Sequence, residues 1–355
     1  MTLDSLLERL VATASVSGEE GPVADFVQGV LAERGIAVQR DGHNLWFEVS
    51  GARAEGGPRL LLNSHLDTVP PCEGWGSDPW APVWSEERLV GLGANDAKGS
   101  VASMLWAAFD LAAAPPDGSV VFAFTAEEET GGRGLASVLD RLGSLDAAVV
   151  GEPTGLQVCT AQRGMLILRC LAKGRSAHAA HAALGENAIH KAARDIARLE
   201  LFRFEGHPLL GASRPQVTQI GGGLARNQVP DSCEFFVDLR TTPNLDHEEL
   251  VRFFASQLES EVHVHSAKYL AKATESGEAI VQAALAAAGA AGPVGSATTS
   301  DWAWLGSLPT VKVGPGDTHR SHRPDEYLLR SELHKGAAFY SALIHGYFSA
   351  AKRKE

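Results

Sequence analysis

The chain has 355 residues, of which 45% are hydrophobic and 21% are charged, which is typical of a soluble globular protein of about two domains. Its net charge of −12 argues against binding to nucleic acid or to an anionic membrane, because both partners require a basic face. The four cysteines suggest no disulfide framework, the amino terminus lacks a signal-peptide pattern, and no apolar run approaches the roughly 20 residues that span a bilayer, so we expect a cytoplasmic protein.

Helical and strand patterns alternate in the first half of the chain. The spacing of apolar residues predicts helices over 3–15, about 21–33 and 100–113, and strands over 59–63, 120–124 and 147–150. The three strands are uninterrupted apolar runs, which are typical of buried parallel strands. Polar residues follow each run directly, and open α/β sheets bind their ligands at the carboxyl ends of such strands.

The middle of the chain has a different pattern, with the order strand, helix, strand, strand, helix, strand. These elements are predicted over 164–172, 187–201, 215–221, 233–240, 246–258 and 261–265. The βαββαβ order matches a ferredoxin-like sandwich. We therefore predict an α/β protein whose first domain comprises residues 1–164 and 269–355, with an inserted α+β domain at 165–268. A helix over 331–350 closes the first domain.

His65 and Asp67 lie two residues apart at the end of the first predicted strand, so their side chains point to the same side of an extended chain. A metal-binding imidazole needs a partner that fixes its tautomer, and Asp67 can supply that carboxylate. The pair alone would equally suit a polar strand terminus. Asp96 lies in a glycine-rich loop before a predicted helix, where capping of the helix is the alternative to metal binding.

The range Glu127–Glu129 directly follows an entirely apolar strand. Three adjacent carboxylates repel one another and are costly to bury unless a cation compensates them, although a solvated loop is an alternative. Glu152 precedes a proline and indicates little by itself, and spacing alone does not choose between His319 and His322.

Taken together, these segments offer two imidazoles and three carboxylates to two divalent ions that share a bridging ligand, with one further carboxylate free to act as a base. Mixed shells of histidine and carboxylate suit zinc in hydrolytic sites, where an open position holds water. Cobalt and manganese accept similar ligands. The residues themselves therefore indicate a metal-dependent hydrolase.

Ten segments, in order along nearly the whole chain, resemble the acetylornithine deacetylase / succinyl-diaminopimelate desuccinylase family of dizinc amidohydrolases. The segments are Asn63–Pro70, Gly91–Gly99, Thr125–Gly131, Gly151–Thr154, Gly174–His178, Gly185–Ile189, Gly221–Pro230, Asp238–Arg240, Thr299–Asp301 and Gly314–Glu326. The resemblance implies a mixed-sheet α/β/α zinc-peptidase-like catalytic domain, and an inserted ferredoxin-like domain that acts as a lid and a dimerisation surface.

The resemblance also implies roles for the candidate ligands. His65 and Glu152 would hold one zinc ion, Glu129 and His322 would hold the other, and Asp96 would bridge both. His322 rather than His319 matches the family's final histidine.

The remaining roles concern catalysis and substrate binding. The middle residue of the acidic triplet, Glu128, matches the family's general base, and Asp67 would orient His65. His178 matches a histidine that stabilises the oxyanion in the neighbouring subunit's site, so a homodimer is expected. The positions that match substrate contacts are Asn227, Arg240, Thr299 and Ser300.

Within this family the ending from Gly314 to His322 is most similar to that of acetylornithine and acetylcitrulline deacetylases. The resulting hypothesis is hydrolysis of a small Nα-acyl amino acid, with N-acetylornithine deacetylation in arginine biosynthesis as the specific reaction. The alternatives are release of lysine or ornithine from an amino-group carrier protein, N-acetylcitrulline deacetylation, desuccinylation of succinyl-diaminopimelate, dipeptide cleavage and a broad aminoacylase. The charge of −12 weighs against an acidic carrier protein. A non-catalytic homologue is disfavoured because every candidate ligand and the base are present.

Overall fold

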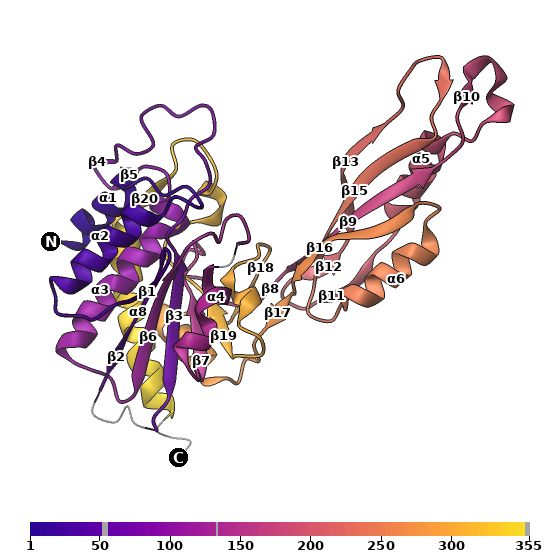
Figure 1. Ribbon diagram of the computed structural model, residues 1–355. Coiled ribbons are helices and arrows are strands. Elements are labelled where there is room, and N and C mark those ends of the chain that lie inside the picture. Colours follow the sequence, from indigo (N-terminus) through magenta and orange to yellow (C-terminus); the bar gives the residue numbers. More distant parts are fainter. Residues whose placement is uncertain (52–55, 133, 352–355) are drawn as a thin grey trace. The chain divides into compact units, whose positions relative to one another are not determined.

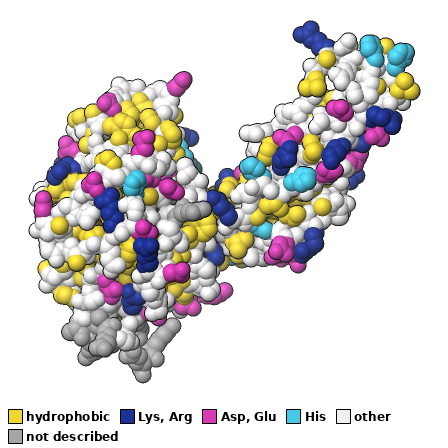
Figure 2. Space-filling view, viewed as in Figure 1, with side chains coloured by type: hydrophobic (Ala, Val, Ile, Leu, Met, Phe, Trp, Pro, Cys, Tyr) yellow, Lys and Arg dark blue, Asp and Glu magenta, His cyan; other side chains and the backbone are white. Residues whose placement is uncertain are grey.

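The computed structural model describes residues 1–51, 56–132 and 134–351, which form two compact units (Figure 1). Unit 1 comprises Met1–Thr160, Thr274–Val294 and the chain from Ser300 onward, and unit 2 comprises Ala161–Ala273 and Gly295–Thr299. Within the described ranges, no helix is both long and apolar enough to cross a membrane. Acidic and basic side chains are interspersed on the visible surface of each unit (Figure 2).

A mixed sheet forms the centre of unit 1, with its strands in the order β1–β2–β6–β3–β7–β19–β8. These strands are β1 (Gln39–Asp41), β2 (Asn44–Ser50), β3 (Arg59–His65), β6 (Ser119–Thr125), β7 (Ala147–Val150), β8 (Cys159–Gln162) and β19 (Thr310–Lys312). The central strands β6, β3, β7 and β19 are parallel to one another, whereas β1, β2 and β8 pair antiparallel with their neighbours. The carboxyl ends of four strands therefore meet at one edge of the sheet.

Helices cover both faces of this sheet because its central strands alternate apolar side chains between the two faces. Leu60 and Leu62 of β3 pack in one hydrophobic cluster, and Leu61 packs in the other. The first cluster includes α1 (Leu3–Ala12), α2 (Gly21–Ala32), α3 (Gly99–Ala113), α7 (Ala279–Ala288) and α8 (Arg330–Ala351). The second includes α4 (Gly134–Leu142) and the 3₁₀ turn η3 (Asp301–Trp304). The result is the expected α/β/α arrangement.

The remaining elements of unit 1 are short. A small sheet joins β4 (Val83–Ser85), β5 (Arg88–Val90) and β20 (Tyr327–Leu329), and two irregular turns, η1 (Ala94–Lys98) and η4 (Thr318–Arg320), follow strands β5 and β19. Another short strand, β18 (Val294–Ser296), pairs with β8.

Unit 2 contains a four-stranded antiparallel sheet with the order β13–β15–β9–β16. Its main elements are β9 (Gly164–Lys173), α5 (Ala188–Leu199), β13 (Pro215–Gly222), β15 (Ser232–Thr241), α6 (His247–Gln257) and β16 (Glu261–Tyr269). Residues of β9 and β15 alternate between buried and less buried positions, and the buried face packs against both helices. The chain order and the strand order are those of a ferredoxin-like α+β fold.

Unit 2 also contains several short elements. They are β10 (Ala177–His178), η2 (Ala179–Leu184), β11 (Phe204–His207), β12 (Gly211–Ser213), β14 (Gln228–Val229) and β17 (Lys272–Ala273). Strands β10 and β14 pair with each other, as do β11 and β12.

The predicted helices and strands are present, with shifted ends. Helix α1 ends at Ala12 rather than at residue 15, because Thr13 adopts an extended backbone. Strand β3 continues two residues beyond the apolar run and includes His65. Strands β1 and β2 were not predicted, and β19 was missed because its three residues are too few to show a period.

Phe122 in the centre of β6 provides a test of this core. Its ring is fully buried and stacks on Phe47 with 5.0 Å between the ring centroids. We expect Phe122→Ala to lower the free energy of unfolding by about 3–5 kcal/mol, because it removes apolar contacts and leaves a cavity. Urea denaturation followed by circular dichroism measures the loss. Leu224→Ala is the control: this side chain is 91% exposed, and we expect a change within about 0.5 kcal/mol. Equal effects of the two substitutions would contradict the assignment of this core.

Candidate active site

Four loops that follow the parallel strands bring the predicted polar residues to one edge of the unit 1 sheet. His65 is the last residue of β3, the acidic triplet follows β6, Glu152 lies two residues after β7, and the loop that contains His322 follows β19. These four strands are consecutive in the sheet, in the order β6–β3–β7–β19, so residues from distant parts of the sequence converge at one place.

Asp96 reaches the same place from the turn η1, immediately before α3. Its backbone departs from helical geometry, and the Asp96–Ala97 peptide bond is cis. The buried carboxylate of Glu326 accepts hydrogen bonds from the backbone N–H groups of Asn95 (2.9 Å) and Asp96 (3.0 Å). A carboxylate more than 200 residues away along the sequence therefore holds this turn in place.

The two carboxylate oxygens of Asp96 face two different histidines. Oδ1 lies 3.2 Å from Nε2 of His65, and Oδ2 lies 3.7 Å from Nε2 of His322. Each histidine has a second carboxylate beside it: Glu152 Oε1 lies 4.0 Å from His65 Nε2, and Glu129 Oε1 lies 2.9 Å from His322 Nε2. Two imidazole–carboxylate pairs thus flank one central carboxylate.

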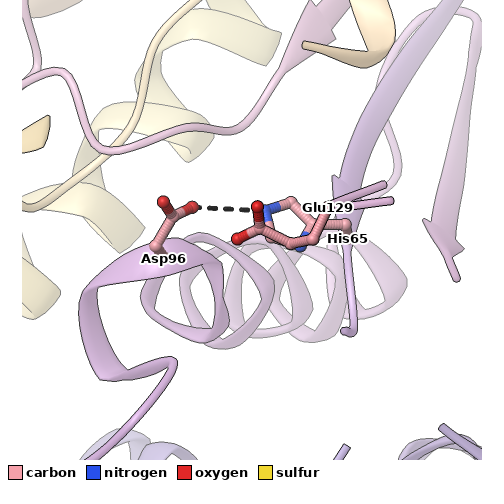
Figure 3. Close-up of side chains that lie close together, drawn as sticks. All are labelled: His65, Asp96 and Glu129. Atoms are coloured by element: carbon pink, nitrogen blue, oxygen red, sulfur yellow. Dashed lines mark hydrogen bonds and ion pairs between the residues drawn. The ribbon is translucent and has the colours of Figure 1, made fainter. Parts of the chain in front are cut away.

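These distances can be compared with those of a metal site. Zinc bonds of about 2.0–2.2 Å in a tetrahedron separate two ligand atoms by about 3.3–3.6 Å. The observed separations of 2.9–4.0 Å lie on both sides of that range. In addition, one ligand atom from each of His65, Asp96 and Glu129 lies within 4.8 Å of the others (Figure 3). The donor set therefore fits divalent metal ions.

His65 is oriented for such a role by Asp67. Its Nδ1 lies 3.0 Å from the Asp67 carbonyl oxygen, which can only accept a hydrogen bond, so Nδ1 carries the proton and Nε2 faces Asp96. Burial lowers the pKa of the His65 imidazole, but the Asp67 and Asp96 carboxylates outweigh it and leave the pKa well above its usual range.

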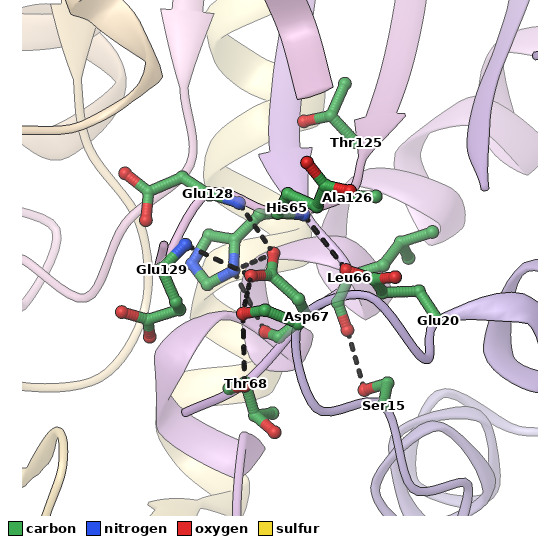
Figure 4. Close-up of polar contacts among 12 residues, drawn as sticks. Ser15, Glu20, His65, Leu66, Asp67, Thr68, Thr125, Ala126, Glu128 and Glu129 are labelled. Carbon is green, nitrogen blue, oxygen red and sulfur yellow. Dashed lines mark hydrogen bonds and ion pairs between the residues drawn. The ribbon is translucent and has the colours of Figure 1, made fainter. Parts of the chain in front are cut away.

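Asp67 also holds the acidic triplet, as the close-up in Figure 4 shows. Its carboxylate accepts hydrogen bonds from the backbone N–H groups of Glu128 (3.1 Å) and Glu129 (3.0 Å), and from the hydroxyl of Ser17 (2.7 Å). The side chains of Glu128 and Glu129 point away from Asp67 (Figure 4). The backbone of Glu127 has a φ of +58°, an uncommon conformation for a residue other than glycine.

Burial, followed by repulsion between the carboxylates, raises the pKa values of two carboxyl groups of the site. Burial raises the pKa of the Glu128 carboxyl well above its usual range, and the nearby Glu152 carboxylate raises it further. Burial likewise raises the pKa of Glu152 to about 7, although Lys312 opposes the shift. Divalent cations at this place would remove the repulsion and let these groups stay ionised.

His322 rather than His319 lies among the candidate ligands. Its backbone has a φ of +60°, and the Glu129 carboxylate raises the pKa of its imidazole to about 9. The preceding residues are held by the amide of Asn95, which accepts from the Asp317 N–H and donates to the Asp317 carbonyl and the Ser321 hydroxyl. His319 instead donates its backbone N–H to the Asp317 carboxylate.

Unit 2 contains other candidates. His178 and Asn227 are neighbours, because β10 pairs with β14 and the Asn227 carbonyl accepts the N–H of Ala179. His178 is exposed, and its Nδ1 accepts from the Ala180 N–H (3.1 Å). The guanidinium of Arg240 is partly occupied by two hydrogen bonds to Asp238 (3.0 and 3.2 Å).

The two candidates of the loop 299–300 fall on either side of the unit boundary. The Thr299 hydroxyl donates to the Arg163 carbonyl (3.2 Å) in unit 2, whereas Ser300 is buried in unit 1. Asp301, the next residue, accepts a hydrogen bond from the Thr125 hydroxyl (2.9 Å) at the end of β6.

Sequence reasoning missed the residues that support the candidate ligands. The most directly placed are Glu20, Asn44, Asn95 and Glu326, which bind backbone groups of the loops described above. Each is a single polar residue in a turn or at an element end, and no spacing pattern distinguishes such residues from solvated ones. Asn95 and Glu326 lie within the matched segments Gly91–Gly99 and Gly314–Glu326, which was the available signal, whereas Glu20 and Asn44 lie outside the matched segments.

The chain is similar to known proteins over most of its length. The model of peptidase family M20/M25/M40 matches residues 61–346. N-acetyl-L-citrulline deacetylase from Xanthomonas campestris is 28% identical, with 92% of both chains covered, and succinyl-diaminopimelate desuccinylase from the same species is 29% identical, with 94% of this chain and 96% of the relative covered.

Solved structures share the fold. Aminopeptidase PepT from Bacillus cereus superposes with a TM-score of 0.81 at 22% identity, covering 97% of this chain and 98% of PepT. The YxeP protein of Bacillus subtilis, described as a dinuclear metal-binding peptidase, superposes with a TM-score of 0.76 at 18% identity, covering 97% and 96%. With most of its length matched and a donor set suited to metal, the chain belongs to peptidase family M20/M25/M40 and is a metal-dependent, amide-hydrolysing enzyme.

Proposed function

We propose that the enzyme hydrolyses the amide bond of an Nα-acyl amino acid, with N-acetylornithine in arginine biosynthesis as the substrate. The observation that carries the proposal is the position of Asp96 between two imidazole–carboxylate pairs, with the half-buried Glu128 nearby. The similarity to N-acetyl-L-citrulline deacetylase over 92% of the chain supports a deacetylase among the reactions of the family.

We assign the ligands of two divalent ions, zinc in the first instance, with cobalt or manganese as alternatives. His65 and Glu152 would hold one ion, Glu129 and His322 the other, and Asp96 both, in agreement with the pairing of their atoms. When bound, the ions supply Lewis-acid chemistry that polarises the amide carbonyl and lowers the pKa of water.

Glu128 is proposed as the proton carrier of the reaction. It would take a proton from the attacking water and return it to the amine that leaves, so one carboxylate serves as base and then as acid. Its backbone N–H donates to Asp67, which holds the side chain in a fixed direction. Asp67 acts through His65 and through this turn rather than on the substrate.

We propose that unit 2 provides the lid and dimerisation surface, with functional domains at 1–164 and 269–355 and at 165–268. His178 would stabilise the oxyanion in the site of the neighbouring subunit of a homodimer, next to Asn227. Arg240, Thr299 and Ser300 are proposed to contact the substrate, Arg240 through a carboxylate.

Mixing inactive His178→Ala chains with inactive Glu128→Gln chains should restore activity if a site combines residues of two subunits.

The substrate is tested by the release of free amine from a panel of amides by the zinc- or cobalt-loaded enzyme. The panel contains acetylornithine, acetylcitrulline, acetyllysine, acetylmethionine, succinyl-diaminopimelate and a dipeptide. We expect the highest kcat/KM for acetylornithine. A higher kcat/KM for another compound of the panel would identify that compound as the substrate and leave the proposed amide hydrolysis unchanged. If the metal-loaded enzyme released no amine from any compound of the panel, the result would contradict the proposal and favour a carrier-protein substrate.

Glu128→Gln is expected to lower kcat by about 10²- to 10⁴-fold, because the amide cannot carry the proton. Bound metal, measured by inductively coupled plasma mass spectrometry, should stay at the wild-type level. Glu248→Gln, a substitution of an exposed carboxylate on α6, serves as the control and should leave both quantities unchanged. Substantial activity in Glu128→Gln would show that another group carries the proton.

Asp96→Ala should weaken both metal sites, since each oxygen of Asp96 faces a different histidine. Loss of a residue that only hydrogen-bonds to a metal ligand lowers metal affinity by about 10- to 100-fold. For Asp96→Ala we expect a larger loss of zinc affinity, measured by competition with a chromophoric chelator. Glu152→Ala should weaken one site and leave the other. Two tightly bound ions in Asp96→Ala would rule out the bridging role.

A further inference from the structure

Four successive backbone N–H groups at the acidic triplet all donate to side chains from other segments. The N–H of Ala126 donates to the Asn44 amide oxygen (2.9 Å), that of Glu127 to the Glu20 carboxylate (3.0 Å), and those of Glu128 and Glu129 to Asp67. The path of this turn is therefore determined by three acceptor side chains.

Glu20 is the carboxylate among these acceptors that sequence reasoning did not identify. It is completely buried and lies in the turn before α2, far from the triplet in sequence. One carboxylate oxygen, Oε1, accepts the N–H groups of Glu127 (3.0 Å) and Gly18 (2.8 Å). The other oxygen, Oε2, lies 2.9 Å from Nδ1 of His43, whose side chain is 36% exposed. Two backbone donors and one imidazole thus hold the carboxylate itself in place.

The location of this contact explains why it matters. Glu127 is the residue with the left-handed backbone, and it directly precedes the proposed base Glu128. A residue other than glycine keeps such a conformation only where its surroundings determine it. Withdrawal of the Glu20 acceptor would remove the side-chain partner of the Glu127 N–H, and the turn could relax toward a commoner backbone.

We propose that Glu20, supported by His43, is a positioning residue that sets the direction of the Glu128 side chain through the N–H of Glu127. This inference rests on the proposed function, in which Glu128 is the base. Glu20 contacts neither the substrate nor a metal ion in this scheme. The positioning depends on an oxygen of Glu20 that lies within hydrogen-bonding distance of the Glu127 N–H, and its negative charge is secondary.

Two substitutions separate the effect of side-chain length from the effect of charge. Glu20→Gln keeps an oxygen at the same distance from the Glu127 N–H and removes the charge. The His43 imidazole, in its other tautomer, can accept a hydrogen bond from the new amide. Glu20→Asp keeps the charge but withdraws the oxygen by about 1.5 Å, beyond hydrogen-bonding distance of the Glu127 N–H. His43→Ala leaves Glu20 intact and removes its partially exposed partner, so it offers a third variant if Glu20→Asp does not fold.

A matched control exists in unit 2. Asp195 is a buried carboxylate that accepts the backbone N–H groups of Glu259 (2.9 Å) and Ser260 (2.8 Å), as Glu20 accepts two N–H groups in unit 1. Asp195→Glu should perturb a carboxylate–backbone contact of the same kind without altering kcat or the exchange of the triplet. If Asp195→Glu lowered kcat as much as Glu20→Asp does, the role of Glu20 would be structural rather than specific to the base.

For Glu20→Asp we expect kcat to fall by about 10- to 100-fold, as for a slightly misplaced catalytic group, with KM and zinc content close to wild type. Glu20→Gln should retain kcat within about threefold of wild type, because its oxygen still accepts the N–H. His43→Ala should show a smaller loss than Glu20→Asp. The reverse order, with Glu20→Gln impaired and Glu20→Asp active, would overturn the inference in favour of an effect of charge. Loss of zinc in parallel with kcat would overturn it in favour of a role in metal binding.

Hydrogen–deuterium exchange provides a readout that does not depend on activity. In Glu20→Asp, peptides that contain residues 126–129 should exchange about tenfold faster or more, whereas in Glu20→Gln they should exchange as in wild type. Unchanged exchange in Glu20→Asp would overturn the inference. If the wild-type enzyme cleaved no member of the substrate panel while the exchange behaved as expected, the proposed function would fail and the positioning of the turn would stand.

Discussion

Carboxylates are buried together at one edge of the unit 1 sheet, and the arrangement there depends on the groups that compensate their charge. Glu20, Asp67 and Glu326 accept hydrogen bonds from backbone N–H groups, so their oxygens are occupied by the protein itself. Asp96 and Glu129 face imidazoles instead and keep oxygens directed at the place where the ligand atoms converge. The first group shapes the loops, and the second is the group that we propose to bind cations, because a buried carboxylate requires either donors or a positive charge.

This separation of tasks follows from the parallel arrangement of the central strands. Parallel strands direct all their carboxyl ends to one edge, so the loops after β3, β6, β7 and β19 are adjacent although the sequence separates them widely. Strands β6 and β7 are buried along their whole length, which provides rigid support on both faces. The reacting groups therefore lie on short loops anchored in the most buried part of unit 1, where small displacements are opposed by tight packing.

Unit 1 by itself contains the proposed metal ligands, the proposed base and the residues that orient them. Unit 2 contributes a different kind of group: His178 in β10 and Asn227, directly before β14, are exposed, and Arg240 is already paired with Asp238. The proposed metal ligands and base thus lie in unit 1, whereas the proposed oxyanion contact His178 and the proposed substrate contacts Asn227 and Arg240 lie in unit 2.

The sequence by itself determined the class of the fold, the main helices and strands and the family, because periodic apolar runs and local motifs are short-range features. It also identified His65, Asp96 and the acidic triplet, since each follows a strand or opens a helix. Only the tertiary structure decided which oxygen of Asp96 faces which histidine, and that Glu20 accepts the N–H of Glu127. Those relations join residues that lie far apart in the sequence, as Asp96 and His322 do. They arise from burial and hydrogen-bond geometry, which a linear pattern does not encode.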